Sequence, residues 1–563
     1  MGGRVDCLGP KPLRVESSVV GLGPDRLEGR FMARCLVAIV AVGLCGAVTV
    51  GQEPVEVDIN WKIRQEATTN SHIMSTLHWL TDVYGPRLTG SPNLKSAGLW
   101  AIEQMAAWGL TNGHLEPFDF GHPGWSNERL SVHLVSPVTD SLVAEALAWT
   151  PGTDGPLRAQ VYHLVLPEQP TAESLDDHFG LVRSEVSGRV VFVGAPAEVG
   201  VTMTGRARRR EDAELTRQFV SRRPTSRTSE RNRSSNAEDG AVIRLTRREI
   251  ESMVTAFLVE AGAVARVNDA GRDHGQIRAF QNRTYDVSQA VPTMVMRNED
   301  YGRIVRLIEF GSGPVELEID IVNLTHPEGR TVNNAIAELS GTDLADEVVM
   351  LGGHLDSWHA ATGATDNAVG VAVMMEAARI LAVIGIEPRR TIRVALWGGE
   401  EQGLLGSQAY VRKHFGSVEM PTPQHAKFGG YFNIDAGTGR ARGAQVFGPD
   451  AAGSVLRDLL MPFRDLGVMG VRTTASRRRA GSDHSSFNQA GLPGISMQQD
   501  PIQYGSYTWH TNLDTYERVI EQDAVASAIV VAAGVYHLAM REELLPRFAD
   551  DEMPGLPART GDQ

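Results

Sequence analysis

The sequence predicts an α/β fold: a three-layer, mostly parallel sheet with an inserted β-rich domain. Two observations carry this prediction. Over residues 327–545, strand-like apolar runs alternate with helix-like segments, which favours parallel strands with helices on both faces. Over residues 131–326, short strand-like runs are broken often by Gly and Pro, which favours a separate unit. A length of 563 residues fits two or three such units.

The elements of the C-terminal region follow from their apolar patterns. Strands are expected at 332–339, 347–353, 391–397, 429–435 and 494–499, and helices near 367–385, 403–415, 451–465 and 514–541. In an open sheet of this kind, ligands bind beyond the carboxyl ends of the strands. Polar residues that directly follow these strands are therefore candidate site residues.

Residues 53–130 are expected to form the N-terminal part of the same domain. Residues 53–70 are polar and are interpreted as a lead-in to the domain. Helical apolar spacing then starts at Ser71 and stops before the Gly85-Pro86 pair. A second helix is predicted at 93–108, closed by a C-terminal glycine.

The insertion at 131–326 resolves into recognisable pieces. Its clearest strand is the apolar run at 189–193, and Thr246 with Glu249 predicts a capping box before a helix. Residues 206–239 are rich in Arg, Ser and Glu and poor in apolar groups, which predicts an exposed, mobile loop. A nucleic-acid patch is the alternative, but acids are interleaved there and stacking aromatics are nearly absent.

Residues 1–52 are predicted as a signal-peptide region. Basic residues around Arg34 precede an apolar run at 35–50 that ends in small residues suited to cleavage. This predicts Met32 as the true start and a secreted or periplasmic protein with no stable membrane span once mature. A retained anchor is the alternative, although the run is slightly short of the ~20 residues that cross a bilayer. Residues 546–563 predict a polar tail.

Composition limits the kinds of ligand and of metal-binding side chain that this chain can have. The net charge of −14 argues against general nucleic-acid binding. The three cysteines, Cys7, Cys35 and Cys45, all lie in or before the signal region. The mature chain would then hold no thiolate ligand, so any metal must be bound by His, Asp and Glu.

A first group of candidate site residues follows the strand at 347–353. His354 and Asp356 stand two residues apart, so on an extended chain they face the same way. His354 is interpreted as a metal ligand, and the Asp356 carboxylate is expected to accept its other imidazole N–H. Asp366 precedes a helix and would suit an N-cap. With these neighbours it is interpreted instead as a carboxylate that bridges two metals ~3.5–4 Å apart.

Further acids and a histidine follow the later elements. Glu400 and Glu401 follow the strand at 391–397 and point apart on an extended chain, which suits one carboxylate on a metal and one on the attacking water. Asp435 ends another strand, and His510 precedes the last helix. The inventory suits two zinc ions and one general base.

These motifs resemble the M28 family of zinc exopeptidases. The matching pieces are those at 353–357, 363–368, 399–407 and 481–484. The insertion resembles a protease-associated (PA) domain in its position and in the run at 188–193. This insertion and the residues at 354–358 resemble the carboxypeptidase Q (plasma glutamate carboxypeptidase) branch of the family in particular.

The resemblance implies two Zn²⁺ per chain and a set of residues that hold them. One zinc is assigned to His354, Asp366 and Asp435, and the second to Asp366, Glu401 and His510. Glu400 becomes the catalytic base, with Asp356 behind His354 as the second catalytic residue. The resemblance also implies a cis peptide at Asp366-Asn367. The residues expected near bound substrate are Ser482, Asp483, His484, Tyr504 and Tyr507, with the oxyanion role left open between the tyrosines.

The implied reaction is hydrolysis of short peptides by a metal-bridged hydroxide, as an aminopeptidase or dipeptidase. A carboxypeptidase of the carboxypeptidase Q type is one alternative, and a one-zinc transferase of the glutaminyl-cyclase type is another. A third is a non-catalytic binding ectodomain on the same scaffold, which the complete ligand set disfavours. The expected partners are short peptides and not nucleic acid, and the resemblance also implies that the chain can form a homodimer.

Overall fold

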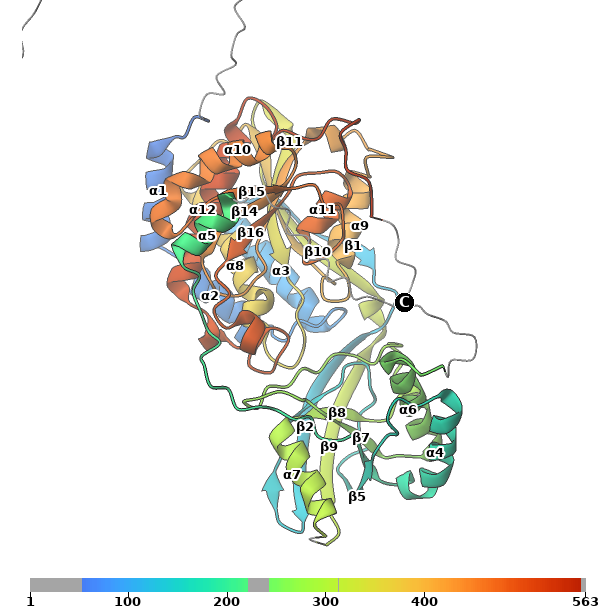
Figure 1. The fold of residues 1–563 in the computed structure, drawn as a ribbon. Helices are drawn as coiled ribbons and strands as arrows, with labels where there is room; N and C mark the ends of the chain where they lie inside the picture. The colour runs from blue at the N-terminus through green and yellow to red at the C-terminus, as the bar shows by residue number, and fades with distance from the viewer. Residues whose placement is uncertain (1–52, 221–242, 312, 558–563) are drawn as a thin grey trace, which may run out of the picture. The chain divides into compact units, whose positions relative to one another are not determined.

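The computed structural model describes residues 53–220, 243–311 and 313–557. The predicted signal region and residues 221–239 of the Arg-rich segment lie outside the described residues. Within them the chain forms two eight-stranded sheets with helices, a mixed α/β architecture as predicted (Figure 1). The last described residue of the polar tail is Pro557.

The first sheet has the strand order β1-β10-β12-β11-β13-β16-β14-β15. Its centre, β12-β11-β13-β16, is parallel, as is the pair β14-β15, while β1-β10, β10-β12 and β16-β14 are antiparallel. The strands are β1 (Thr111–Asp119), β10 (Thr331–Leu339), β11 (Leu344–His354), β12 (Arg390–Trp397), β13 (Phe428–Asn433), β14 (Ala441–Phe447), β15 (Val471–Thr474) and β16 (Gly494–Gln499).

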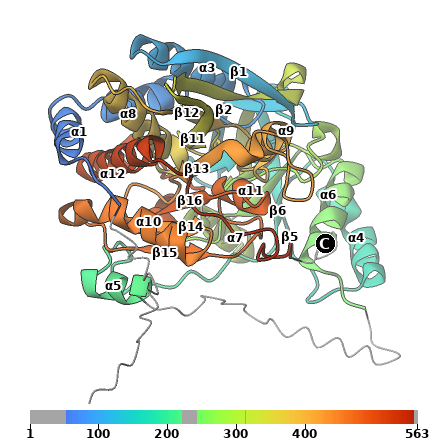
Figure 2. The ribbon, with the colours of Figure 1, turned by 90° about the horizontal axis from the view of Figure 1, so that it is seen from above.

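Helices cover both faces of this sheet, which confirms the three-layer prediction (Figure 2). The helices are α1 (Val57–Thr69), α2 (Ile73–His78), α3 (Pro92–Ala107), α8 (Val369–Val383), α9 (Leu405–His414), α10 (Asp450–Leu460), α11 (His484–Gln489) and α12 (Glu521–Met540). Alternate residues of β11 serve opposite layers. Val349 and Leu351 join the core with α8 and α12, while Val348 and Met350 join the core with α9 and α11.

The second sheet has the order β3-β2-β9-β5-β6-β7-β8-β4. Its strands are β2 (Gly124–Ser136), β3 (Asp140–Ser141), β4 (Ala144–Ala146), β5 (Leu157–Leu164), β6 (Val190–Val193), β7 (Ala265–Asp269), β8 (Thr293–Met296) and β9 (Glu316–His326). Its helices are α4 (Ala172–Val186), α6 (Arg247–Ala261) and α7 (Asn298–Glu309), so helices accompany the strands of the insertion. The predicted Thr246 capping box is present at α6. Likeness to a PA domain stays a prediction.

Most of the polar lead-in at 53–70 forms helix α1, an element not predicted from the sequence. Its buried positions are Asn60, Ile63 and Ala67, three and four residues apart, so one face packs on the domain while the rest is polar. This narrow apolar face is the physical reason that the sequence pattern suggested no helix.

The Arg-rich segment is also not a free loop over its described part. Residues 212–220 form helix α5 (Asp212–Val220), and Arg208 pairs with Ile502 in an antiparallel bridge. We call residues 206–220 the strap. Phe219 packs so closely on the first domain that a Cβ added at Gly470 would lie 2.7 Å from its own Cβ. Burial of Leu215 and packing of Phe219 therefore anchor this segment together with the charge pairs described below.

Among the described residues, α12 is the helix that is long and apolar enough to cross a bilayer. About 83% of its most apolar stretch is buried inside the fold. Its hydropathy is therefore accounted for by its place in the helical layer next to α8.

Candidate metal centre

The candidate residues meet at the carboxyl edge of the parallel strands. His354 is the last residue of β11, Glu401 follows β12, and Asp435 follows β13. Asp366 comes from the turn before α8, and His510 from the segment between β16 and α12. Adjacent parallel strands end at the same edge of a sheet, which brings these distant positions together.

The two oxygens of Asp366 face two different histidines. Asp366 Oδ1 lies 3.3 Å from His354 Nε2, and Asp366 Oδ2 lies 3.1 Å from His510 Nε2. Asp435 Oδ1 is 3.3 Å from His354 Nε2, and Glu401 Oε2 is 2.9 Å from His510 Nε2. The five side chains thus divide into two groups that share one carboxylate.

This arrangement fits a bound cation. Ligand atoms of His354, Asp366 and Glu401 all lie within 4.8 Å of one another. Asp366 Oδ2 and Glu401 Oε1 are buried and accept no hydrogen bond, although buried carboxylate oxygens normally have a partner. Imidazole nitrogen and carboxylate oxygen are the donors that zinc takes in proteins. The cis peptide expected at Asp366-Asn367 is present.

Charges in this centre act strongly on one another. Burial, opposed by His354 and reinforced by Asp435 and Glu401, raises the pKa of Glu400 well above its usual range. Burial opposes the charged form of His510, but Glu401 and Asp366 raise its pKa to about 10. The carboxyl groups of Asp366, Glu400, Glu401 and Asp435 outnumber the two histidines here, and a bound cation would favour their ionised forms.

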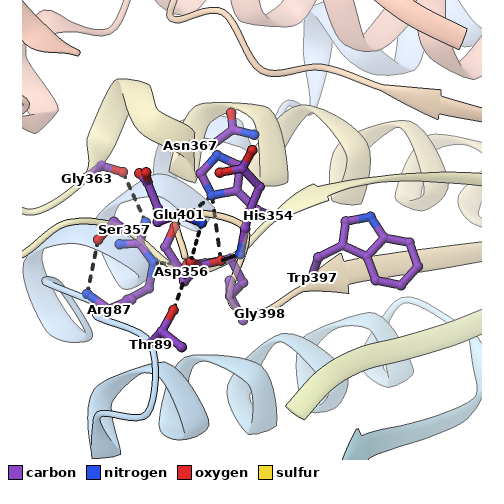
Figure 3. Close-up of polar contacts among 12 residues, drawn as sticks. Arg87, Thr89, His354, Asp356, Ser357, Gly363, Asn367, Trp397, Gly398 and Glu401 are labelled. Carbon is purple, nitrogen blue, oxygen red and sulfur yellow. Dashed lines mark hydrogen bonds and ion pairs between the residues drawn. The ribbon is translucent and has the colours of Figure 1, made fainter. Parts of the chain in front are cut away.

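Asp356 acts differently from the prediction (Figure 3). His354 Nδ1 lies 2.9 Å from the backbone oxygen of Asp356, and the carboxylate is 3.8 Å away. That carboxylate instead accepts the backbone N–H groups of Glu400 and Glu401, each at 3.1 Å, and the Thr89 hydroxyl at 3.0 Å. The reason is that β11 ends at His354, so the two-residue alternation of an extended strand no longer holds. Asp356 positions the glutamate pair.

Two supporting residues were not singled out from the sequence as part of the site. Asp514 accepts the backbone N–H groups of Thr365 at 2.5 Å and Asp366 at 3.0 Å, which fixes the bridging carboxylate from behind. Buried Arg87 donates to four backbone oxygens, those of Leu80, Leu355, Thr362 and Gly363. Asp514 lies in the polar segment between His510 and the last helix, and nothing in the sequence indicated that it binds the backbone of Thr365 and Asp366.

Of the predicted substrate residues, one lines the pocket and the others lie outside its lining. Tyr504 lines the pocket beside Glu400 and Asp435. The ring of Tyr507 instead lies 5.8 Å from that of His274 in the second sheet's domain and is not among the pocket residues.

The turn at 482–484 stands just behind the pocket, whose wall includes Gly481. Ser482 Oγ accepts a hydrogen bond from Asn433 at 2.9 Å, and burial lowers the pKa of His484 to about 4. Asp483 is buried with no hydrogen-bond partner at either carboxylate oxygen, and burial raises its pKa to about 7. These three side chains border the site instead of lining it.

The second sheet's domain also reaches this centre. Arg278 Nε donates to the backbone oxygen of Trp509 at 3.1 Å, and its guanidinium lies 4.5 Å from the centre of that indole ring. The ring of Phe280 meets that of His510 edge to face at 5.6 Å. The connection between β7 and β8 therefore packs beside one of the candidate ligands.

A pocket of about 410 Å³ opens next to these residues. Its lining includes Asp366, Glu400, Glu401, Asp435 and Trp509. The volume falls in the range of small-molecule sites, so the pocket suits a compact ligand.

Comparisons with known proteins agree with this chemistry. Residues 334–535 match the model of peptidase family M28. Carboxypeptidase Q of Rattus norvegicus is 28% identical over 473 residues, 83% of this chain and 85% of that protein. Human carboxypeptidase Q is 26% identical over 493 residues, 87% of this chain and 89% of that protein.

One solved structure shares the fold over most of the chain. It is that of a peptidase M28 precursor from Shewanella amazonensis SB2B, with a TM-score of 0.59 and 24% sequence identity. The alignment covers 87% of this chain and 98% of that chain.

Proposed function

We propose that this chain, which carries a peptidase family M28 domain, is a zinc exopeptidase that hydrolyses short peptides with two zinc ions. One zinc is held by His354, Asp366 and Asp435, and the other by Asp366, Glu401 and His510. The observation that carries this proposal is the placement of the two Asp366 oxygens, at 3.3 Å and 3.1 Å from separate histidines. One carboxylate can bridge two cations in this way.

Bound zinc would supply Lewis acidity that lowers the pKa of water toward ~7 and polarises the peptide carbonyl. Glu400, which is not needed as a ligand, takes the proton of the attacking water and later gives it to the leaving amine. Asp356 holds the backbone of Glu400 through its N–H at 3.1 Å, so the base is fixed in position.

Tyr504 is the tyrosine that we assign to the oxyanion. It lines the same pocket as Glu400, whereas Tyr507 does not. Burial raises the pKa of Tyr504 well above its usual range, and the carboxylates around it act in the same direction. The phenol therefore keeps its proton and can donate a hydrogen bond to the oxygen on which negative charge develops.

Replacement of Glu400 tests this function. We expect Glu400→Gln to keep two zinc ions per chain by elemental analysis while kcat for a dipeptide falls roughly 1000-fold, because no group takes the proton. Glu309→Gln, at an exposed position of α7, is the matched control and should keep full activity. Unchanged turnover in Glu400→Gln would remove the mechanism, and loss of zinc together with activity would make Glu400 a ligand.

We also propose an extracytoplasmic location. The support is the signal-like segment at 32–50, with its basic start, apolar run and small residues. N-terminal sequencing of the native protein tests it, because a mature start after residue 47 is expected and a start within 1–31 would contradict it.

A further inference from the structure

A pair of arginines beside the strap is not matched by carboxylates. Arg210 of the strap and Arg472 of β15 are both partly buried, and neither forms an ion pair within the described part of the chain. Buried Arg379 shows the usual arrangement, because it pairs with Glu376 at 2.8 Å and with Glu66 at 2.7 Å. Burial of a positive group without such a partner is costly. The pair of Arg210 and Arg472 therefore needs an explanation.

Both guanidinium groups have donors that are not used. The Nε atoms of Arg210 and Arg472 are buried and have no hydrogen-bond partner among the described residues. Their other side-chain contacts are long and go to neutral amides: Arg210 Nη1 lies 3.4 Å from Gln218 Oε1, and Arg472 Nη2 lies 3.5 Å from Gln498 Oε1. Since buried N–H groups normally have an acceptor, these donors suit a ligand that supplies oxygen atoms.

The packing of the strap brings the two arginines together. Helix α5, which follows Arg210, packs against β15 at the edge of the first sheet (Figure 2). Phe219 of α5 makes this contact close, because a Cβ added at Gly443 of β14 would lie 2.6 Å from its Cζ. Burial lowers the pKa of Arg472, and the nearby charge of Arg210 lowers it further. The two positive charges therefore repel each other at the contact between the strap and β15.

The acids of the strap cluster are engaged by a different arginine. Asp212 of α5 accepts Arg442, and both oxygens of Asp500 accept Arg442 Nη1, at 3.0 and 2.9 Å. Asp500 meets Arg210 through the backbone N–H, at 3.0 Å. These carboxylates therefore serve Arg442, and the donors of Arg210 and Arg472 stay available to an anion from solution.

The chemistry of this pair selects a class of ligand. Two neighbouring positive charges exclude a cation. Guanidinium N–H groups bind carboxylates and phosphates, and a tetrahedral oxyanion with two negative charges can balance both arginines at once. A carboxylate carries one charge and can balance only one of them. The pair therefore favours phosphate or sulfate over a carboxylate.

We propose that Arg210 and Arg472 bind a doubly charged oxyanion, phosphate or sulfate, between the strap and β15. The bound anion joins the strap to the edge of the first sheet, beside the ion pairs of Arg442. Neither arginine lines the pocket next to Glu400, so this site is separate from the candidate metal centre and does not depend on the proposed reaction.

Titration calorimetry on the full zinc-loaded protein tests the site. The probes are sodium sulfate, sodium phosphate and sodium acetate, at an ionic strength held constant with chloride so that general screening does not change. We expect one sulfate or phosphate per chain and at least roughly 10-fold weaker binding of acetate. Arg210→Gln and Arg472→Gln should each raise the Kd for sulfate roughly 10- to 100-fold, because hydrogen bonds to a charged group are lost. The tighter of the two dianions is the ion that the site prefers.

Arg217→Gln is the matched control, because it removes an exposed positive charge from the same helix. Its Kd for sulfate should stay within about twofold of that of the unmodified protein. Melting temperatures give an independent measurement. Sulfate stabilises proteins in general by its exclusion from their surface, so the part of the increase that is lost in Arg210→Gln and Arg472→Gln reports the site. Either variant decides the test if the other does not fold.

Three results would contradict the proposal. Absence of sulfate and phosphate binding would overturn the site. Equal binding in the unmodified protein and in both variants would also overturn it, because the anion would then bind elsewhere, such as at the zinc ions. Acetate that binds as tightly as sulfate, with the same loss in the variants, would replace the dianion by a carboxylate. Peptide hydrolysis enters none of these measurements, so the proposed function can fail while this site stands.

Discussion

Two of the buried charge clusters in the described part of the chain differ in how their charges are balanced. At the metal centre, His354 and His510 face the carboxylates of Asp366, Glu401 and Asp435, and two buried oxygens accept no hydrogen bond. At the strap, aspartate carboxylates are paired with arginine guanidinium groups.

The strap cluster centres on Asp500, which is 0% exposed. Its two oxygens accept Arg442 Nη1 at 3.0 and 2.9 Å, and one also accepts the backbone N–H of Arg210 at 3.0 Å. Arg442 further donates to Asp212 of α5, and Arg209 donates to Asp523 at 2.6 Å. Each carboxylate named here meets an arginine.

The pairing of buried charges distinguishes a structural charge cluster from a functional one. Burial of charge is costly unless it is paired and hydrogen-bonded. The strap meets this requirement with the chain's own side chains, so it holds the fold together. The candidate metal centre does not, which supports the proposal that it binds a cation from solution.

The largest expected effect is at the strap. Arg442→Met should lower the free energy of unfolding by about 3–5 kcal/mol, because Asp500 remains buried without its partner. Denaturant unfolding measures this. The control is Arg389→Met, which breaks surface pairs with Asp343 and Glu542 and should cost no more than about 1 kcal/mol. A similar small loss in both variants would show that the strap pairs contribute no more than surface pairs.

Removal of metal is the matching test at the other cluster. Stripping zinc should abolish activity and lower the free energy of unfolding by about 2.7–4.1 kcal/mol relative to protein in zinc at 100 to 1000 times its Kd. Calorimetry with and without chelator measures the change, and added Zn²⁺ should restore it while Mg²⁺ should not. An unchanged melting temperature in metal-free protein would contradict the proposed difference between the two clusters, because the acidic centre would then be stable without a cation.

The smallest expected effect concerns a carboxyl group whose pKa is raised by burial and not by neighbouring charges. Glu145 on β4 lies beside Val295 of β8, and burial alone raises its pKa to about 8. The folded state therefore holds the proton more tightly than the unfolded state, so its contribution to stability is complete below pH ~4.5 and is lost as the pH rises through 8.

Glu145→Gln should therefore match the unmodified protein near pH 5 and exceed its stability by about 1–2 kcal/mol at pH 9. Unfolding curves at the two pH values measure the difference, with Glu309→Gln as the control that should show none. Equal stability of Glu145→Gln and the unmodified protein at both pH values would mean that Glu145 is ionised in the folded state.

Much of the first domain was predictable because its pattern is local. The strand expected at 494–499 coincides with β16, and those expected at 332–339 and 391–397 differ from β10 and β12 by one residue at the start. Apolar runs followed at once by polar residues mark both the strand and its carboxyl end. The positions of His354 and Glu401 could be predicted for this reason.

The remainder depends on contacts between distant parts of the chain. The strap has few apolar residues, and its contacts are with distant positions: Arg442, more than two hundred positions later, binds Asp212, and Phe219 packs on Gly470. The orientation of Asp356 depends on where β11 ends and on the turn at Glu400, which no spacing within the motif reveals. Pairings of this kind have no periodic signature in the sequence.

The contacts of Ile502 and Arg278 have a consequence for how this protein can evolve. The strap pairs with the chain at Ile502, and Arg278 of the second sheet's domain binds Trp509, next to the proposed ligand His510. Both contacts fall within residues 502–509, so the insertion is not structurally independent of the first sheet's domain. Deleting the insertion, or exchanging it for an unrelated domain, would remove the contacts that Arg208 and Arg278 make with this segment. Substitutions in the insertion and in residues 502–509 should therefore be correlated among related proteins.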